Sequence, residues 1–494
     1  MRKIIDKKSI PTLPSVRQIA DRIAAGEKTV TLAGLSGSAR AFAAALLFDR
    51  IAKPCAVVCP TEKEAAAFAR DLALFLGDEA VLYYPPLDFL SIDMFALQRE
   101  EELSRLSALT RFQTAPDRIL VTCAAAWMQK IMPKAEFASY LKILSTGDLL
   151  ISDETAATLV AGGYRRVALV EEEGEFSMRG NILDVFPPGE AMPLRLELAG
   201  DEIESIRRFD SATQRSQGAA DAFILGPAAE ILITSDRLAR AVRNVRRRTE
   251  ELDLAREVRN RLVETLKQQT AASINPVFLP LFYEDFDDPD RCRSRTLSSL
   301  HEYLSADTLL ILDDPQAIRQ AAAGVYANID KMLFKAKAGG KFYLEADCLN
   351  LGDAALEASL ESFRAIRLAG LLIDSETAQP PLTLSGGPEP PPTAPETNEI
   401  REESLLRQTA FKVKDRLAAG GRVFLISPTP EDALRMRHLL SAYDLPMTPV
   451  DASTPLLSAF SEPLDTPALQ IATGRLSGGF VLPEAKLTLL GEEE

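Results

Sequence analysis

The chain contains 494 residues, of which 46% are hydrophobic and 26% are charged, as in an ordinary globular protein. This length is too great for a single compact core and predicts several domains. The formal net charge of −15 excludes a global positive field, so contact with DNA would require a local basic patch. Five dispersed cysteines without CxxC spacing predict buried thiols rather than disulfides or zinc ligands, and two distant histidines argue against a His-based metal site. We therefore expect no metal and no cofactor.

The first part of the chain alternates short apolar strands with amphipathic helices. Thr61 and Glu64 have the spacing of a capping box, which predicts the start of one of these helices. Strands that alternate with helices predict a parallel sheet covered on both faces. The predicted strands are 29–33, 56–59, 80–84 and 118–122, and the predicted helices are about 39–51, 61–75 and 100–112.

A glycine-containing loop follows the first strand and precedes the first of these helices. A working phosphate loop needs Gly-x4-Gly-Lys-Ser/Thr, in which the lysine contacts phosphate oxygens and the hydroxyl ligates magnesium. Here Ala39, Arg40 and Ala41 replace the second glycine, the lysine and the hydroxyl residue. The pattern predicts a degenerate nucleotide loop without ATP hydrolysis. By itself it also fits a strand-to-helix turn that never bound nucleotide. The loop residues are Gly34, Gly37, Ser38, Ala39, Arg40 and Ala41.

From about residue 145 the pattern becomes β-rich, with short strands punctuated by turn residues, which predicts a small antiparallel module. A helix is predicted over about 236–269; its arginines could touch phosphates, but the acidic residues that follow favour a solvated face. The α/β pattern resumes at 308–314, where Asp313 and Asp314 end an apolar strand. An active site would have an Asp-Glu pair there for magnesium and water, so this is a degenerate Walker B motif. Degenerate forms of both motifs, in the right order, indicate a motor domain that no longer hydrolyses ATP.

A Pro-rich segment separates this part from a last α/β unit. We predict an α/β fold with a degenerate RecA- or helicase-like parallel-sheet domain, an inserted β-rich domain, and a second small α/β domain after the linker. The expected divisions are 1–144 and 228–375 for the two parts of the degenerate domain, 145–227 for the β-rich insert, 376–400 for the linker and 401–494 for the last unit.

The most specific sequence signals lie in the β-rich segment. The runs 163–167, 174–187 and 201–210, followed by Thr213-Gln214-Arg215-Ser216, together resemble the N-terminal, UvrB-like region of the bacterial transcription-repair coupling factor family. Tyr83 to Asp88 and Gly474 to Phe480 fall in the order expected for this family. UvrB itself keeps an intact phosphate loop and a long aromatic hairpin that clamps damaged DNA. Here only Pro85 to Met94 occupies the place of that hairpin, which is too short for it.

The resemblance implies a non-hydrolysing platform whose β-rich domain recruits UvrA in transcription-coupled nucleotide excision repair. Its implied UvrA-binding residues are Arg165, Arg166, Arg179 and Phe186. Two simpler interpretations stay open: Arg179 could pair with Glu173 or Glu175, and the core is the favoured place for Phe186. The alternative functions are a divergent ATP-dependent, DNA-binding repair enzyme of the UvrB type, and an autoinhibitory unit.

The resemblance also implies what lies outside this chain. The full-length protein would be an ATP-dependent DNA translocase, and RNA polymerase and DNA would be contacted only through parts absent here. The remainder of that polypeptide would be a second partner, which masks the UvrA-binding surface until engagement. No signal peptide and no stretch long enough to span a membrane are found in the sequence, so we expect a soluble, cytoplasmic protein.

Overall fold

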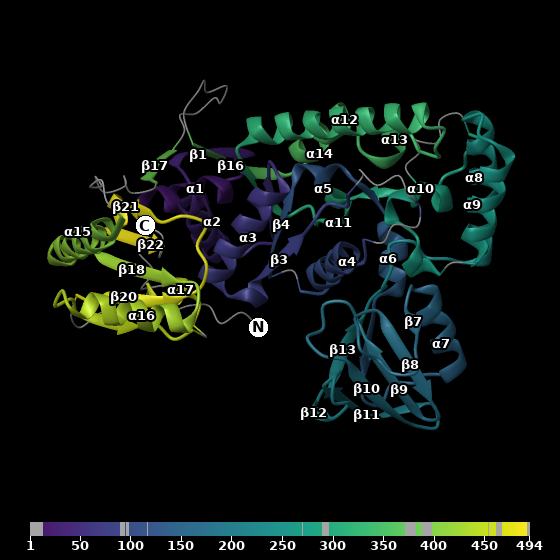
Figure 1. The fold of residues 1–494 in the computed structure, drawn as a ribbon, viewed down its shortest axis with the longest axis horizontal. Helices are drawn as coiled ribbons and strands as arrows, with labels where there is room; N and C mark the ends of the chain where they lie inside the picture. The colour runs from purple at the N-terminus through teal and green to yellow at the C-terminus, as the bar shows by residue number, and fades with distance from the viewer. Residues whose placement is uncertain are drawn as a thin grey trace.

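Three sheets organise the molecule in the computed structural model (Figure 1). A parallel sheet with its helices lies at the centre, a β-rich domain projects from it, and a smaller α/β unit lies beside it at the C-terminal end. The structure describes residues 13–88, 94, 98–115, 117–268, 270–288, 296–370, 382–387, 398–452, 454–460 and 467–491, without the side chains of 398–405. Among these residues, no helix has the length and apolar character to cross a bilayer.

The central sheet has seven strands, all parallel, in the order β17-β1-β16-β15-β2-β4-β3. β2, β4 and β15 are buried along their whole length, because helices cover both faces of the sheet and continuous apolar runs can then be accommodated. This is the parallel sheet, covered on both faces, that the alternating pattern predicts. Its strands are β1 (Thr29–Leu35), β2 (Cys55–Cys59), β3 (Val81–Tyr84), β4 (Ile119–Cys123), β15 (Leu309–Asp313), β16 (Arg364–Ala369) and β17 (Leu382–Gly386).

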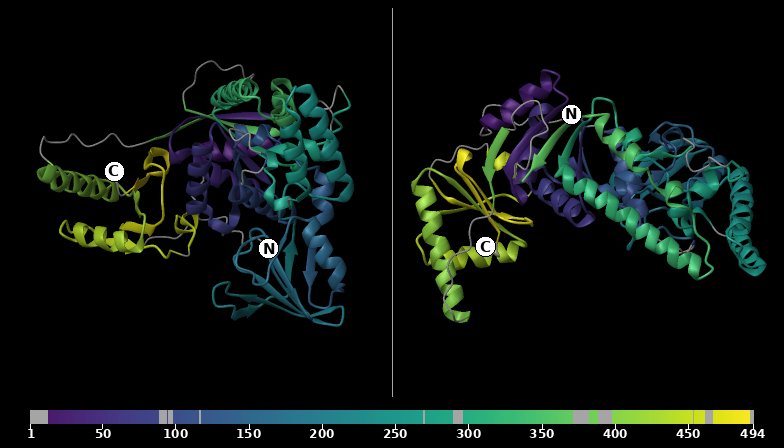
Figure 2. Two further views of the ribbon diagram at one scale, coloured as in Figure 1. Left: turned by 45° about the vertical axis from the view of Figure 1, so that its right-hand side comes forward. Right: turned by 90° about the horizontal axis from the view of Figure 1, so that it is seen from above.

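Helices flank this sheet, and their ends agree with local sequence signals (Figure 2). The predicted capping box is present: Glu64 N donates to Thr61 Oγ1, and Thr61 N donates back to the Glu64 carboxylate. The helices of this part are α1 (Pro14–Ala24), α2 (Ser38–Ile51), α3 (Glu62–Leu76), α4 (Arg99–Thr114), α5 (Ala124–Met128), α6 (Lys134–Tyr140), α10 (Pro280–Tyr283), α11 (Leu300–Tyr303), α12 (Pro315–Ala338), α13 (Ala346–Leu349) and α14 (Asp353–Glu361), and a short ribbon joins β5 (Lys130–Ile131) to β14 (Ser298–Ser299).

The predicted helix over 236–269 is wrong in one respect, because two helices occupy this stretch. α8 (Ser235–Glu251) ends, Asp253 adopts the left-handed region with φ +50°, and α9 (Arg256–Gln268) then begins. A short polar side chain such as aspartate tolerates this conformation, so the chain turns here without a glycine or proline. Gln269 itself lies outside the described residues.

The β-rich domain has a core of its own. Its six-stranded sheet runs β12-β11-β10-β9-β8-β7, and all pairs are antiparallel except β7 with β8. Alternate residues such as Phe176, Leu183 and Leu196 face this core. The elements are β6 (Lys142–Ser145), α7 (Ser152–Ala161), β7 (Arg165–Arg166), β8 (Glu175–Arg179), β9 (Ile182–Phe186), β10 (Leu194–Ala199), β11 (Glu202–Phe209), β12 (Ser216–Ala219) and β13 (Ala222–Leu225), with β6 paired to β13.

Buried contacts fix the β-rich domain on the central domain. The guanidinium of Arg105 on α4 is fully buried, pairs with the carboxylate of Glu230 at 2.5 Å, and lies 4.4 Å from the ring centre of Tyr84. Gly163 has φ +89°, and a Cβ at this position would lie 2.3 Å from the Cβ of Ala229, so only glycine lets the two segments approach this closely. These contacts join the β-rich domain to the central domain.

The C-terminal unit is built on a five-stranded sheet of order β19-β20-β18-β22-β21. It shares core with the central domain, since the Phe42 ring of α2 packs against Phe460 and Phe480 at centroid distances of 5.3 and 5.5 Å. Its elements are α15 (Asn398–Ala418), β18 (Arg422–Ser427), α16 (Pro430–Ser441), β19 (Met447–Pro449), α17 (Leu456–Ala459), β20 (Leu469–Thr473), β21 (Phe480–Leu482) and β22 (Leu487–Gly491).

Two expectations differ from the structure. Residues 382–386, expected within the Pro-rich linker, form β17 at the edge of the central sheet beside β1, because this short stretch alternates apolar and polar residues. The remainder of 376–400 lies mostly outside the described residues, as do parts of Pro85 to Met94. Cys55, Cys59 and Cys123 are buried free thiols as expected, but Cys348 is disulfide-bonded, so the expectation of free thiols is wrong there; Cys292 lies outside the described residues.

Candidate functional site

The loop predicted to be a degenerate nucleotide loop has the backbone path of a strand, a tight loop and a helix N-terminus. Gly34 has φ +91°, and a Cβ here would approach Leu384 O of β17 to 3.0 Å. Gly37, with φ +55°, is the N-cap of α2. Ala39 and Ala41 are buried, so the methyl groups that replace the second glycine and the magnesium hydroxyl are part of the core. The two alanine side chains of this loop therefore serve packing.

Arg40 and Asp313, predicted as remnants of the two halves of a nucleotide site, form an ion pair. Arg40 Nη1 lies 2.7 Å from Asp313 Oδ1, and the Asp313 side chain is 2% exposed. Burial raises the pKa of Asp313 to about 6, against the opposing effect of Arg40. In an active site this carboxylate would face magnesium, whereas here an arginine of the loop occupies it.

Asp314 has a structural task at the same strand end. It adopts φ +58°, and its carboxylate accepts a hydrogen bond from Ala317 N at 3.1 Å, which caps α12. Pro315 takes the first helical position, where its fixed φ is favourable. A carboxylate committed to a helix cap is not positioned as the general base that activates water.

The segment Gly474 to Phe480 closes the loop from the C-terminal unit. Ser38 Oγ lies 2.9 Å from Ser477 Oγ and accepts a hydrogen bond from Gly478 N at 3.1 Å. Ser477 N and Oγ both donate to the buried carboxylate of Asp71 on α3. The helix N-terminus that would receive phosphate in an active loop is therefore contacted by the protein's own chain.

The β-rich sheet places three of the four predicted UvrA-binding residues on one face. Arg165 is paired with Glu175, which is paired with Phe186 on the next strand, so their side chains lie in one row. Arg179 follows Glu175 by four residues on β8 and shares its face. Arg166 pairs with the core residue Phe176 and so belongs to the opposite face, where it is exposed at the sheet edge.

The arginines of this polar face pair with carboxylates of the same domain. Arg165 Nη2 lies 2.6 Å from Glu175 Oε1 and 3.1 Å from Glu172 Oε2, and 57% of its side chain is exposed. Burial acts to raise the pKa of Glu175, but hydrogen bonds from the N–H groups of Glu171 and Glu172 and from Arg165 lower it. Among the described residues, Arg179 pairs with neither Glu173 nor Glu175; its Nη2 donates to Asp184 Oδ2 at 3.0 Å. Phe186 is half-buried rather than core.

Arg195 on β10 was not identified from the sequence. Its Nε and Nη2 contact the two oxygens of Asp184 at 2.7 and 2.9 Å, and its guanidinium lies 4.6 Å from the ring centre of Phe209. The alternation Leu194-Arg195-Leu196 put Arg195 on the polar face, but only the strand register places it opposite Asp184. Arg195 therefore neutralises the buried carboxylate that Arg179 also touches.

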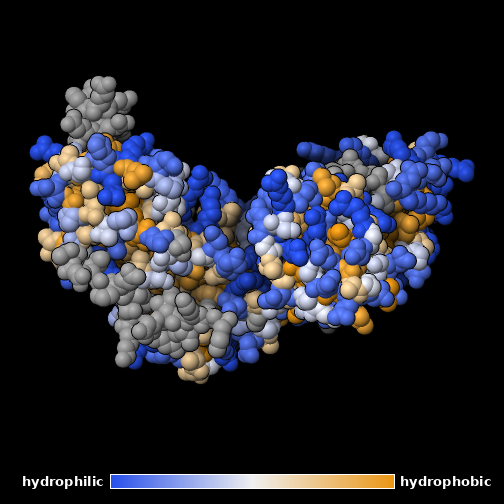
Figure 3. Space-filling model, turned by 90° about the horizontal axis from the view of Figure 1, so that it is seen from below, coloured by the Kyte–Doolittle hydropathy of each residue, from blue (hydrophilic) through white to orange (hydrophobic). Residues whose placement is uncertain are grey.

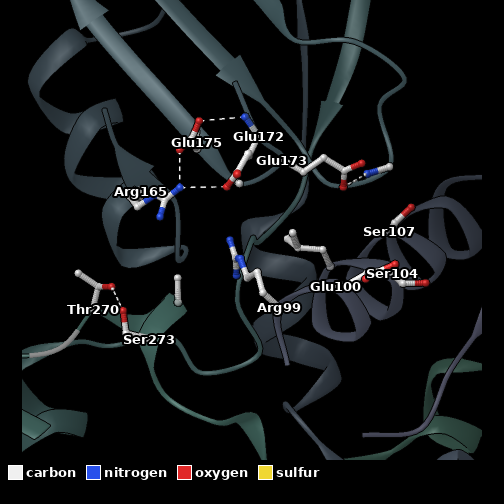
Figure 4. Close-up of a pocket in the computed structure, with 14 residues that line it drawn as sticks. Arg99, Glu100, Ser104, Ser107, Arg165, Glu172, Glu173, Glu175, Thr270 and Ser273 are labelled. Atoms are coloured by element: carbon white, nitrogen blue, oxygen red, sulfur yellow. Dashed lines mark hydrogen bonds and ion pairs between the residues drawn. The ribbon is translucent and has the colours of Figure 1, made fainter. Parts of the chain in front are cut away.

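A cleft of about 640 Å³ separates the β-rich domain from the central domain (Figure 4). Arg165, Glu172, Glu173 and Glu175 line it from the β-rich side, facing Arg99, Glu100, Ser104 and Ser107 of α4. Figure 3 views the molecule from below, where the β-rich domain forms the right-hand lobe with mostly hydrophilic surface. Arg165 thus lines a cleft between the β-rich domain and α4.

Comparison with known proteins matches these regions to DNA repair proteins. A family model described as the UvrB interaction domain matches residues 143–230, which include the whole six-stranded sheet. Over 97% of its length the chain is 28% identical to a transcription-repair-coupling factor of Myxococcus xanthus and 27% identical to that of Bacillus subtilis (strain 168). The chain is therefore similar, over nearly its whole length, to part of these transcription-repair-coupling factors.

The matches also define how much of these relatives is present. The chain spans about two fifths of their length, 40% for the Myxococcus protein and 39% for the Bacillus protein. The UvrABC system protein B of Cupriavidus pinatubonensis is 26% identical over 63% of this chain and 48% of that protein. The chain is thus similar to proteins of both groups.

Proposed function

We propose that this chain is a non-hydrolysing platform that recruits UvrA through the polar face of its β-rich domain. The observation that carries the proposal is the match of residues 143–230 to the UvrB interaction domain, on a sheet whose arginines are exposed. A surface that pairs arginine with an aromatic side chain is typical of the strongest contacts in protein interfaces.

The arginines of this face can exchange partners at low cost. Arg179 can leave Asp184 without stranding a buried charge, because Arg195 contacts both oxygens of that carboxylate. The pair of Arg165 with the exposed Glu172 contributes only about 0–1 kcal/mol. The buried Glu175 keeps hydrogen bonds from the N–H groups of Glu171 and Glu172 when Arg165 changes partner. Carboxylates of UvrA could therefore replace the internal partners with bidentate pairs.

We propose that the chain does not hydrolyse ATP, because its own side chains occupy the loop at Gly34 to Ala41. Arg40 is paired to Asp313, Asp314 caps α12, and Ser38 is bonded to the closing segment. Binding of MgATP would have to break the Arg40–Asp313 pair and expel Ser477 before any phosphate contact formed. Each rearrangement subtracts from nucleotide affinity.

The wider role belongs to the same proposal. We infer that the chain acts in the cytoplasm as part of a longer polypeptide, whose remaining parts supply the contacts with RNA polymerase and DNA and the ATP-driven translocation. Those remaining parts would also mask the UvrA-binding surface until they engage. Within that longer polypeptide, this region would only recruit UvrA, which brings the repair enzymes to the damaged site.

Co-elution with UvrA tests the proposal. We expect the double variant Arg165→Glu with Arg179→Glu to lose co-elution with UvrA in size-exclusion chromatography and to keep its circular dichroism spectrum. Arg435→Glu, on the remote helix α16 with a 63% exposed side chain, is the matched control and should co-elute as the unaltered chain does. Retention of the complex by the double variant would reject the assigned surface.

A further inference from the structure

A groove of about 1000 Å³ lies on the central domain, away from both the nucleotide loop and the β-rich domain. One wall is the start of α14, and the other is formed by the β5–β14 ribbon and α11. Small residues, Gly352, Ala354, Ala355 and Ala358, line the α14 side and leave room for close approach of a bound backbone. Nothing in the proposed recruitment of UvrA uses this groove.

Asn350, which lines the groove, has an unsatisfied side chain. It is 1% exposed, and within the residues that the structure describes neither its Oδ1 nor its Nδ2 has a hydrogen-bond partner. Its backbone is fixed, because Asn350 N donates to Ala346 O and the residue forms a bridge with Gln129. A buried polar group without a partner costs about 1–3 kcal/mol, so a ligand that supplies both an acceptor and a donor to Asn350 would be stabilised there.

The N-terminus of α14 supplies further donors beside Asn350. Gly352 is the N-cap and offers no side-chain acceptor. Leu356 N makes the first helical bond, to Gly352 O, so the N–H groups of Asp353, Ala354 and Ala355 precede it. All three residues line the groove and are exposed. A helix start of this kind attracts a carboxylate or another anion.

The charges around the groove limit which anion fits. Lys130 contributes one positive charge, and its Nζ donates to Asp347 O at 2.8 Å. Asp347, Asp353 and Glu302 contribute three negative charges, although Glu302 is engaged by Ser298 and Ser299. This balance disfavours a phosphate dianion more than a carboxylate, since like charges repel in proportion to their magnitude.

We propose that this groove binds the C-terminal end of a peptide chain, a carboxylate next to an amide. The carboxylate would lie at the N-terminus of α14, and the adjoining peptide unit would exchange two hydrogen bonds with the Asn350 amide. The small residues of α14 then accommodate the peptide backbone. Capture of a chain end by backbone N–H groups and one side-chain amide is a known mode of peptide recognition.

Titration with a model peptide tests the site. The probe is N-acetyl-trialanine with a free carboxylate, compared with its C-terminal amide, with acetate and with inorganic phosphate, each followed by ligand-observed NMR. We expect saturable binding of the free acid and at least about tenfold weaker binding of the other three. Equal binding of acid and amide, tighter binding of acetate or phosphate, or no saturable binding of the acid up to about 10 mM would overturn the proposal.

Variants separate the site from nonspecific binding. Asn350→Leu should abolish binding of the acid while the melting temperature stays or rises, because an apolar side chain replaces an unsatisfied amide. Asn260→Leu, on the exposed side of α9, is the matched control and should bind normally. Ala358→Phe, which fills the groove from an exposed helix position, should block binding even if Asn350→Leu fails to fold. Unchanged binding in Ala358→Phe would place the peptide elsewhere and contradict the assignment.

Discussion

The nucleotide loop and the polar face of the β-rich domain both pair arginines with carboxylates, but they differ in burial. In the loop, Arg40 pairs with the almost completely buried carboxylate of Asp313, and in the part of the chain that the structure describes no second cation pairs with this carboxylate. On the β-rich face, the buried Asp184 has two arginines, so one of them remains exchangeable. An ion pair closes a site when the cation is the sole compensation of a buried charge. It leaves a surface available when a second arginine, as at Asp184, or backbone N–H groups, as at Glu175, also compensate that charge.

The largest effect on stability is expected from breaking the loop pair. Arg40→Ala leaves Asp313 buried and without its cation, which should lower the free energy of unfolding by about 3 kcal/mol near neutral pH. Denaturant titration measures this. Arg17→Ala removes an exposed partner of Asp21 and should change stability by less than about 0.5 kcal/mol. Similar small losses in both variants would mean that the loop pair does not close the site.

The same pair predicts a pH dependence. The pKa of Asp313 is raised to about 6 in the folded protein from an ordinary value of 3.8, so the folded state holds this proton more tightly. The resulting stabilisation is complete below that ordinary value and is lost as the pH rises through about 6. The deficit of Arg40→Ala should therefore be smaller near pH 5 than near pH 8, because protonation removes the stranded charge. A deficit independent of pH would contradict this explanation.

A smaller effect on stability distinguishes Arg195 from Arg179, the two arginines that pair with Asp184. Arg195→Ala removes the bidentate partner and should cost about 2 kcal/mol, whereas Arg179→Ala, whose side chain is 53% exposed, should cost about 0.5 kcal/mol. Thermal or denaturant unfolding of the two single variants measures the difference. If both variants lose the same stability, Arg179 is a structural residue and is not free to meet a partner.

The smallest expected effect is the change in melting temperature when MgATP is added. Millimolar MgATP should change the melting temperature by less than about 1 °C, because a ligand stabilises only in proportion to its occupancy of the folded state. Differential scanning fluorimetry with and without MgATP measures the shift. A clear shift that disappears in Arg40→Ala would support the alternative, a divergent ATP-dependent enzyme.

Sequence patterns predicted the features that depend on neighbouring residues. The buried strands, the capping box at Thr61 and the glycine loop were accessible because burial periodicity and caps are local. The break at Asp253 was not, because it rests on one non-glycine residue with positive φ. β17 was missed because a short edge strand takes its pairing from β1, far away in sequence.

The candidate site shows the same limit. The sequence singled out Arg40 and Asp313 separately, but their contact depends on the parallel sheet bringing β1 and β15 near each other. Arg195 and Asp184 lie opposite each other because of the register between β9 and β10, and this register could not be read from the sequence. Ser477 reaches the loop from the C-terminal unit, a tertiary contact without a local signature.

One titration tests the central claim most directly: the affinity for UvrA of the unaltered chain, of Arg40→Ala, and of Arg165→Glu with Arg179→Glu, measured by calorimetry under identical conditions. Our account predicts that Arg40→Ala binds UvrA as the unaltered chain does, provided it is folded, and that the double reversal loses at least about 100-fold in affinity, as expected for hot-spot arginines. Equal affinity of the double reversal and the unaltered chain, or a loss confined to Arg40→Ala, would contradict it.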